Sequence, residues 1–405
     1  MRASRSEPSP AEAADALPPH YFRHEHGRLV SVLARRFTSL ELCEDAAQVA
    51  LLRAVETWPR SGRPDDPGAW LYRVAHHALI DALRRERRGP AGDHPFEEPS
   101  LAPIDPPLAS ELPDDLLLML FACADPSLPP GSQIALALKT LCGFSTEEIA
   151  LRLFQSPDAI HKRLQRARAR LRELGAPDAT RVPSVLQMLY LLFNEGYSSA
   201  LPESVLRREL CEEAMRLTRV LAAHALGPPE ANALLALMCF HASRFDARID
   251  GVGGLLLLKE HDRSRWDRSL IEEGVTQLRA SARGDRLTRY HVEANIAALH
   301  ALAPTYDATP WAEIEALYAT LAGPLPALNR AIALAEDGRT EEAIASLERA
   351  PKPPRPYYLW EATWAELRWR IGEEEAARAH LQRAIELAPT NAERALLERR
   401  RDSRG

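Results

Sequence analysis

The sequence predicts an all-α protein. Ala, Leu, Arg and Glu dominate its 405 residues, while aromatic residues make up only 6%. The first group has high helix propensity, whereas strands are enriched in aromatic and β-branched side chains. Apolar residues recur three and four positions apart in several segments, which is the spacing of one helix face. The length indicates two or three domains.

The first helical block spans residues 20–88 and predicts a small helix bundle. Its apolar residues at helical spacing form three groups: Leu29, Leu33 and Phe37; Ala47, Leu51, Leu52 and Val55; and Leu71, Val74, Ala75, Leu79 and Leu83. Pro64, Pro67 and Gly68 mark a break between the second and third groups.

An acidic, proline-rich segment follows at residues 89–115. It holds seven prolines and seven carboxylates but no Lys or Arg. Proline keeps such a chain extended, and like charges oppose its collapse. We therefore expect a linker between two domains.

The second helical block, residues 116–175, contains two short helices joined by a turn. Ser145 and Glu148 have the spacing of a capping box, and Ser156 followed by Pro157 predicts a second helix start. In the second helix Ile160, Leu164 and Ala167 form an apolar stripe.

The remaining face of that second helix is basic. From 157 to 172 the chain has one acid, Asp158, and six bases: Lys162, Arg163, Arg166, Arg168, Arg170 and Arg172. A tight turn followed by a basic helix is typical of helix-turn-helix domains, whose second helix enters the major groove. Its first residues then reach base edges and its later arginines reach phosphates. A solvated basic face on a structural helix is the alternative.

A further basic stretch ends the first block. Arg73, Arg84, Arg85, Arg87 and Arg88 follow or flank Trp70 and Tyr72. Basic residues interleaved with aromatic rings suit single-stranded DNA, because exposed rings stack on unpaired bases. The spacing of Trp70 and Val74 is equally consistent with a core position.

The third block, residues 182–400, is helical throughout. Two helical hairpins stand out, at residues 326–350 with a turn at Asp337–Gly338 and at residues 360–389 with a turn at Gly372. Earlier, Asn194 and Gly196 predict a helix C-cap, since both residues tolerate left-handed backbone geometry. We expect Tyr197 to pack against the preceding helix-turn-helix domain.

Other function classes have little support. The sequence has no glycine-rich phosphate loop, no GxSxG and no HExxH, so no enzyme is expected and no cofactor. Its five cysteines form no CxxC pair, and His76 and His77 are adjacent, which disfavours a metal site. No long apolar run or leader is evident, so no membrane association is expected and the cytoplasm is the expected location.

Taken in order, these blocks resemble the sigma-70 family of transcription initiation factors. Residues 44–54, EDAAQVALLRA, look like the family's polymerase-binding helix, and residues 70–88, WLYRVAHHALIDALRRERR, look like its promoter-melting helix. Residues 116–174 resemble its fourth region. No third region lies between these two, as in the extracytoplasmic-function (ECF) group. With LYLLFNEGYSSA at residues 189–200, the chain resembles the ECF subgroup that has a long C-terminal extension. The two hairpins look like tetratricopeptide repeats (TPR).

The resemblance implies a role for three sets of residues. Core-polymerase binding falls on Asp45, Gln48, Leu52, Arg53 and Glu56. Minus-ten DNA binding falls on Trp70, Arg73, His77, Arg84 and Arg85. Minus-thirty-five DNA binding falls on Ser156, Asp158, Ala159, His161, Lys162, Arg163 and Arg166.

The implied function is that of a sigma factor. It would bind core RNA polymerase and promoter DNA, and its fused C-terminal domain would regulate it, with stacked hairpins offering a concave surface to a protein or peptide partner. The alternative is a helix-turn-helix regulator of transcription with a TPR adaptor domain, which would bind duplex DNA without polymerase.

Overall fold

The computed structural model of the chain forms two compact units, Met1–Met188 and Leu189–Gly405. The residues that it describes are 19–37, 39–87, 112–153, 155–171, 178–197, 208–225, 227–250, 254–354 and 356–404. Within them the only element besides helices is a single antiparallel bridge between Ile249 and Leu255, which confirms the all-α prediction. In the same residues, no helix combines the length and apolar character needed to cross a membrane.

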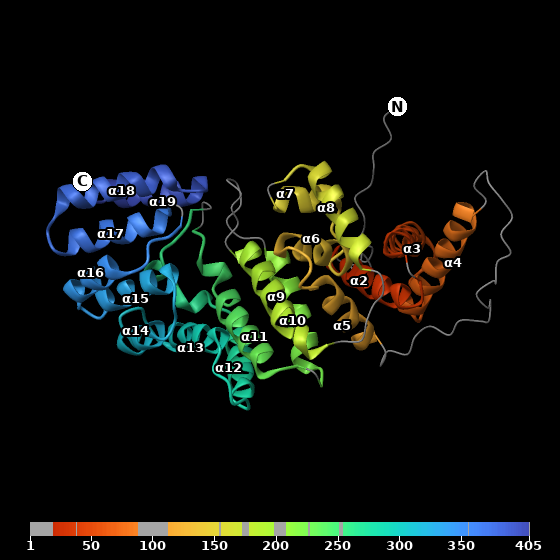
Figure 1. The fold of residues 1–405 in the computed structure, drawn as a ribbon, viewed down its shortest axis with the longest axis horizontal. Coiled ribbons are helices and arrows are strands. Elements are labelled where there is room, and N and C mark those ends of the chain that lie inside the picture. Colours follow the sequence, from red (N-terminus) through yellow and green to blue (C-terminus); the bar gives the residue numbers. More distant parts are fainter. Residues whose placement is uncertain are drawn as a thin grey trace. The chain divides into compact units, whose positions relative to one another are not determined.

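The N-terminal unit consists of two helix clusters (Figure 1). Its elements are α2 (Pro19–Arg36), α3 (Leu40–Ser61), α4 (Pro67–Arg87), α5 (Leu112–Cys123), α6 (Pro130–Thr140), α7 (Thr146–Arg152), α8 (Pro157–Arg170), the 3-10 turn η1 (Ala179–Arg181) and the first part of α9 (Val182–Tyr197).

The first cluster is the predicted helix bundle, α2–α4. Leu33, Leu71 and Leu79 are fully buried, and α3 contributes small side chains such as Ala47 and Ala50. Alanines at these positions let α3 approach its neighbours closely, because no larger side chain separates the helix backbones. The bundle therefore fixes α3 and α4 side by side.

The expected linker and the structure differ at its C-terminal end. Helix α5 already begins at Leu112, although the composition placed the linker up to residue 115. Asp115 is buried and forms an ion pair with Arg35 of α2 at 2.9 Å. A carboxylate with a partner of opposite charge can join a core, so acidic composition alone misplaced this boundary. The remaining part of the expected linker, residues 89–111, lies outside the described residues.

Helix α2 also contacts the second cluster, which consists of α5–α8, at the residue that follows α6. A Cβ atom on Gly27 would lie 2.2 Å from the carbonyl oxygen of Leu141, so only glycine permits this approach. Gly143 (φ +66°) turns the chain after α6, and a Cβ there would lie 3.1 Å from His26. The two clusters of the N-terminal unit are therefore in direct van der Waals contact.

The C-terminal unit is a succession of helices from the end of α9 onward. Its helices are α10 (Arg208–Ala223), α11 (Pro229–Ala242), α12 (Arg268–Ser281), α13 (Arg289–Leu302), α14 (Trp311–Ala319), α15 (Pro324–Glu336), α16 (Thr340–Arg349), α17 (Tyr358–Arg370), α18 (Glu374–Leu387) and α19 (Asn391–Asp402). The described residues between α11 and α12 contain three 3-10 turns: η2 (Phe245–Ala247), η3 (Leu258–Glu260) and η4 (Arg263–Arg265).

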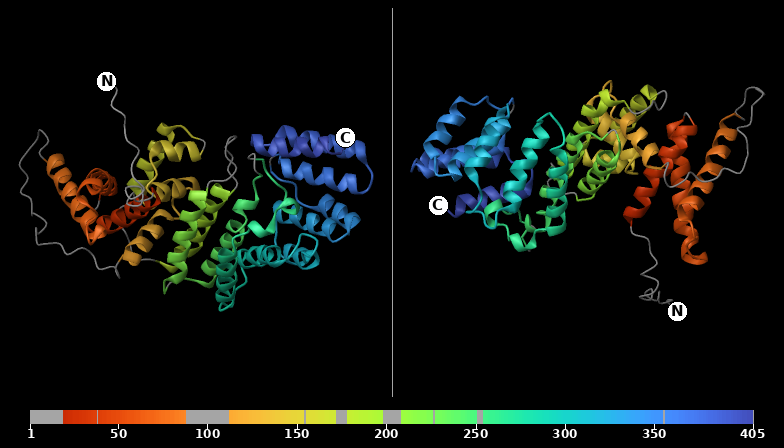
Figure 2. Two further views of the ribbon diagram at one scale, coloured as in Figure 1. Left: turned by 180° about the vertical axis from the view of Figure 1, so that it is seen from behind. Right: turned by 90° about the horizontal axis from the view of Figure 1, so that it is seen from below.

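Both hairpins indicated by the sequence are present as neighbouring helices (Figures 1 and 2). Helices α15 and α16 are joined through Gly338 (φ +82°), and α17 and α18 through Gly372 (φ +80°). Glycine adopts this left-handed backbone without steric strain. Trp360 joins the two hairpins, because it lies in one apolar cluster with Leu328, Leu334 and Leu347.

The expected helix end at Asn194 and Gly196 is wrong, since α9 continues through both residues to Tyr197. Tertiary contacts outweigh the local capping preference here. Tyr197 stacks on Phe193 with ring centroids 5.9 Å apart, and the Arg248 guanidinium lies 4.0 Å above its ring. The Tyr197 side chain therefore packs on residues of the C-terminal unit. Its expected contact with the helix-turn-helix domain stays a prediction.

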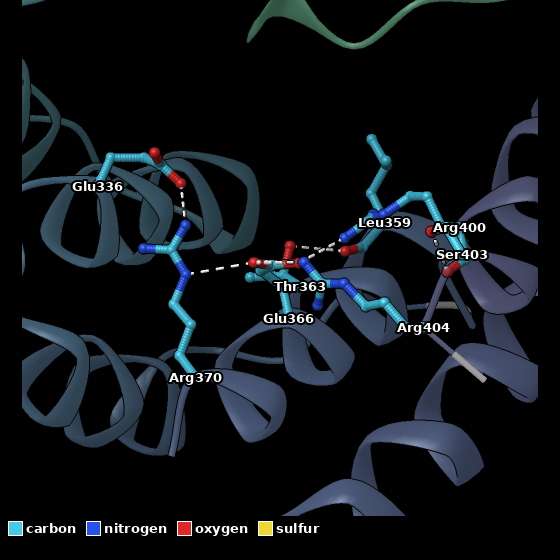
Figure 3. Close-up of polar contacts among 8 residues, drawn as sticks. All are labelled: Glu336, Leu359, Thr363, Glu366, Arg370, Arg400, Ser403 and Arg404. Atoms are coloured by element: carbon cyan, nitrogen blue, oxygen red, sulfur yellow. Dashed lines mark hydrogen bonds and ion pairs between the residues drawn. The ribbon is translucent and has the colours of Figure 1, made fainter. Parts of the chain in front are cut away.

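A polar network closes the end of the C-terminal unit around Glu366 of α17 (Figure 3). Its carboxylate accepts hydrogen bonds from Arg400 at 2.6 Å, Arg370 at 3.2 Å and Arg404 at 3.3 Å. Burial by itself would raise the pKa of Glu366, but the guanidinium groups of Arg400 and Arg404 hold it below its ordinary value. The network links α17 to α19.

We expect Glu366→Gln to lower the stability of this end of the unit by about 1–3 kcal/mol, because it leaves the mostly buried Arg400 without its counter-ion. Hydrogen exchange of residues 391–402 measures the effect. Glu374→Gln is the matched control, since it removes an exposed i,i+4 pair with Arg378 and should change exchange little. Equal exchange rates in both variants would show that the network does not hold α19.

Candidate nucleic-acid and polymerase interfaces

Helix α3 has one buried and one exposed face. Cys43, Ala46, Ala47, Ala50, Ala54 and Trp58 are buried. The five residues expected to bind polymerase, Asp45, Gln48, Leu52, Arg53 and Glu56, are all exposed. Ser39 caps the helix start by accepting a hydrogen bond from the Leu42 amide at 3.4 Å.

The exposed face of α3 is partly apolar. Leu52 is 60% exposed, Val55 53% and Val49 39%. The apolar spacing of the sequence placed Leu52 and Val55 with the bundle core, and the structure corrects this. A row of exposed apolar side chains with charged neighbours on a rigid helix is typical of a protein-binding surface.

Helix α4 exposes most of the residues expected near the minus-ten element. Arg73, His77, Arg84 and Arg85 are exposed, and Arg73, His77 and Arg84 lie on one face by helical spacing. Trp70 is half-buried and packs against Trp58, with ring centroids 5.5 Å apart. Much of its ring is therefore held by the bundle, while part of it stays accessible.

The adjacent histidines of α4 lie in different environments. His76 is buried beside Phe37 and Tyr72, and burial lowers its pKa, whereas His77 faces solvent. Across the described part of the chain, no three His, Cys, Asp or Glu side chains converge as a metal site would require.

The helix-turn-helix geometry follows the local sequence signals. The Glu148 amide donates to Ser145 Oγ at 3.1 Å, and the Ser145 amide donates to Glu148 Oε2 at 2.8 Å. Ser156 accepts from the Ala159 amide at 3.2 Å and starts α8. These caps confirm the predicted helix starts of the α7–turn–α8 segment.

Helix α8 presents most of its predicted minus-thirty-five residues to solvent. Ile160, Leu164 and Ala167 form its buried stripe, as predicted. Ser156, Asp158, His161, Lys162 and Arg166 are exposed, while Ala159 and Arg163 are partly buried. Arg163 donates to the Gly131 carbonyl at 3.3 Å, so part of its hydrogen-bonding capacity is used within the domain.

The later arginines of α8 differ from the sequence-based expectation. Arg168 is ion-paired with the buried carboxylate of Glu44 and lies 3.7 Å from Glu41, both on α3. Arg170 donates to the Ser127 carbonyl at 2.7 Å. Both side chains therefore contact protein in this structure, where phosphate contacts were expected. Arg172 lies outside the described residues.

Glu44 is the residue of this region that the sequence reasoning missed. Its side chain is 2% exposed although its neighbour Asp45 faces solvent. Burial raises the pKa of Glu44 to about 7, against the opposing effect of Arg168 and Lys139. The only local signal was the position of Glu44 between the apolar residues Cys43, Ala46 and Ala47.

The raised pKa of Glu44 predicts a pH-dependent stability. Protonation is favoured in the folded state, so the contribution of Glu44 is greatest below pH 4.5 and is lost as pH rises through about 7. Between pH 4.5 and 7.5 we expect wild type to lose roughly 1–3 kcal/mol relative to Glu44→Gln. Urea unfolding at a series of pH values measures this difference.

The buried His26 does not obscure the comparison. Burial lowers its pKa to about 4, so it destabilises the fold below pH 6.5, but it does so equally in both proteins. Glu41→Gln is the control for loss of an acid near Arg168, because the Glu41 side chain is 60% exposed. Parallel pH profiles for wild type and Glu44→Gln would contradict the assignment.

Comparison with known families agrees with this geometry. Residues 21–89 match Sigma-70 region 2, and residues 120–171 match Sigma-70, region 4. Residues 181–282 match a family of unknown function. A helix-turn-helix regulator, the alternative interpretation, has no need of a region 2 domain, so the first match favours the sigma factor.

Similar proteins extend over different parts of the chain. An uncharacterized protein, R00370, from Rhizobium meliloti (strain 1021) is 36% identical over 392 residues, covering 92% of each chain. The probable RNA polymerase sigma factor RfaY from Xanthomonas campestris pv. campestris is 28% identical over 187 residues, which are 40% of this chain and 45% of that protein.

The RNA polymerase sigma factor CarQ from Myxococcus xanthus is 32% identical over 177 residues, which are 40% of this chain and 90% of CarQ. No solved structure matches the chain. Members of the sigma-70 family are not enzymes, and their domains imply core RNA polymerase and promoter DNA as partners. Regions 2 and 4 occur here in order, and the match covers nearly all of CarQ. The chain therefore belongs to the sigma-70 family of RNA polymerase sigma factors.

Proposed function

We propose that this chain is a cytoplasmic initiation factor of the ECF type, with a C-terminal extension that regulates it. The observation that carries the proposal is the exposed apolar and charged face of α3 next to two helices with exposed basic faces, α4 and α8. A plain DNA-binding protein would have no use for the α3 face.

Polymerase binding is assigned to the exposed face of α3. Leu52 is the proposed centre of the contact, with Val49 and Val55 beside it and Asp45, Gln48, Arg53 and Glu56 around them. Exposed apolar groups gain most from burial in a complex, and surrounding charges select the partner.

DNA contacts are assigned to α4 and α8. On α8, Lys162 and Arg166 are exposed. Lys162 lies in the N-terminal half of the helix, where side chains of a recognition helix reach the major groove, and Arg166 lies about one turn further on. Ser156, Asp158, Ala159, His161 and Arg163 are the proposed neighbours. On α4, Arg73, His77, Arg84 and Arg85 are proposed to follow the minus-ten strand, and the accessible part of Trp70 to stack on a base.

The C-terminal extension is proposed to contain TPR-like repeats. What supports this is a recurrence at 34 residues, the length of such a repeat. Gly338 and Gly372 have this separation, as do the buried pairs Ala343 and Ala377, and Leu347 and Leu381. Stacked hairpins of this kind expose a continuous surface, which we propose binds a protein or peptide partner.

Run-off transcription with purified core polymerase tests the initiation role. Leu52→Asp should abolish transcripts by weakening polymerase binding at least tenfold, because a charge replaces an apolar contact. Leu302→Asp is the matched control, since Leu302 is 58% exposed in the other unit and should leave transcription unchanged. Normal transcription by Leu52→Asp would contradict the α3 assignment.

Lys162→Glu should leave the binding of core polymerase unchanged but weaken binding to promoter duplex by about tenfold, because a negative charge replaces a positive one at the DNA surface. Run-off transcription should fall accordingly. Arg349→Glu, at an exposed position, is the control. Loss of polymerase binding in Lys162→Glu would contradict the division of roles between α3 and α8.

The regulatory role is tested by a chain that ends at Gly175. Lower transcription than the full chain would assign activation to the extension, and higher transcription would assign inhibition. Identical promoter output and polymerase affinity in the two chains would exclude a regulatory role under those conditions.

A further inference from the structure

The C-terminal unit contains a buried guanidinium group without a carboxylate partner. Arg244, which follows α11, is only 9% exposed. It donates to the Tyr197 hydroxyl at 3.1 Å and contacts His241 Nδ1, while its Nε has no hydrogen-bond partner. Among the described residues, no Asp or Glu lies within ion-pair distance of it. An isolated charge is costly to bury, so this arrangement calls for an anion.

Arg244 lines a cavity of about 320 Å³. This volume is near the lower end of those that hold small ligands, roughly 300–1,000 Å³. His300 lines the same cavity, and its buried Nδ1 also lacks a partner. Two polar side chains from different elements line one cavity, and each has a buried hydrogen-bonding atom without a partner.

Most of the remaining wall is apolar. It includes Phe193, Leu237, Met238, Ile296 and Ala297, from helices α9, α11 and α13. These side chains suit the hydrocarbon part of a small molecule, which would be removed from water there. The cavity is thus amphipathic, with a cationic group and an apolar wall.

Of the two arginines in the cavity wall, one has no carboxylate partner among the described residues. Arg289, also in the wall, is paired with Glu293 at 2.7 Å. Burial lowers the pKa of His300 to about 3, and burial also lowers that of His241, with Arg244 adding to both effects. Both imidazoles are therefore neutral at pH 7, and Arg244 remains without compensation.

The nearby Arg248 and Arg263 do not compensate it either, because both are cations. Arg248 donates to the Tyr197 carbonyl at 2.8 Å, and Arg263 donates to the His300 carbonyl at 2.7 Å. Burial by itself would raise the pKa of the Tyr197 hydroxyl, but the charges of Arg244 and Arg248 lower it. A phenol is a weak substitute for a carboxylate.

In a second cavity of the unit, four charged side chains of the wall are paired within the protein, and Lys259 is exposed to solvent. This cavity also measures about 320 Å³, and its wall includes Glu336, Glu366, Arg370 and Arg400. Every one of these charges is paired within the protein (Figure 3). The Arg244 cavity differs from this second cavity in having an arginine without a carboxylate partner.

We propose that the Arg244 cavity binds a small organic monocarboxylate. Its carboxylate lies on Arg244 and His300, and its hydrocarbon part lies against Phe193, Met238 and Ile296. Arg244 is the one arginine of the wall without a carboxylate partner among the described residues, which favours a single negative charge, and the carboxylate of Glu293 in the wall disfavours a dianion such as phosphate. The site is independent of the promoter-reading function, since all its residues belong to the C-terminal unit.

Calorimetric titration of the full chain tests the proposal with pairs of probes. Benzoate and octanoate represent the proposed class, benzamide and octanamide are their uncharged counterparts, and inorganic phosphate is the alternative anion. We expect at least one carboxylate to bind with 1:1 stoichiometry and its amide to bind at least tenfold more weakly. This comparison needs no substitution, so it does not depend on the folding of a variant.

Arg244→Met should abolish carboxylate binding. It should not lower the melting temperature of the free chain, because it removes an unpaired buried charge. Arg286→Met removes an exposed arginine and is the control for net charge. Any of three results would overturn the proposal: neither carboxylate binds at 10 mM, the amides bind as tightly as the carboxylates, or phosphate alone binds.

Discussion

A helix at the surface of a helical domain buries one stripe and leaves the opposite face in solvent, and this constraint shapes the two proposed interfaces on α3 and α8. Helix α3 meets it with small side chains on one face, so that the bundle closes around Ala47 and Ala50. Its larger apolar residues, Leu52 and Val55, then remain in solvent. Helix α8 similarly buries Ile160, Leu164 and Ala167 and keeps its basic residues outside. The narrow buried stripe leaves a rigid surface for a partner.

Buried charge imposes a second constraint, and the chain meets it in two ways. Glu44, Asp115 and Glu366 each have an arginine partner, which offsets part of the free-energy cost of burying the carboxylate. Arg244 is the contrasting case, with a hydroxyl and an imidazole as its polar contacts. The three paired carboxylates form structural ion pairs, whereas the cavity lined by Arg244 contains a cation that a bound anion could neutralise.

Local features were predictable from the sequence because they depend on residues three or four positions apart. The caps at Ser145 and Ser156 and the apolar stripe of α8 are of this kind. The ion pair of Glu44 and Arg168 joins residues 124 positions apart, and no local pattern encodes it. The Arg244 cavity draws its wall from α9, α11 and α13, so only the folded chain brings these side chains together.

Two expectations failed where a local rule met a competing contact. Asn194 and Gly196 have the composition of a helix end, yet the packing of Tyr197 extends α9 through them. Leu52 and Val55 have core spacing, but α3 has apolar residues on two faces and periodicity does not say which face is buried. In both cases the local pattern is present in the sequence, but tertiary packing determines the structure.

The ion pair between Arg168 and Glu44 links the protonation of Glu44 to the binding of DNA by α8. One guanidinium cannot be fully engaged by a buried carboxylate and by a phosphate of the double helix at the same time. When Arg168 leaves, an enclosed Glu44 loses its main electrostatic support, and its affinity for a proton increases. A contact between Arg168 and a DNA phosphate would then be accompanied by proton uptake at Glu44 near neutral pH, although Glu44 itself touches no nucleic acid.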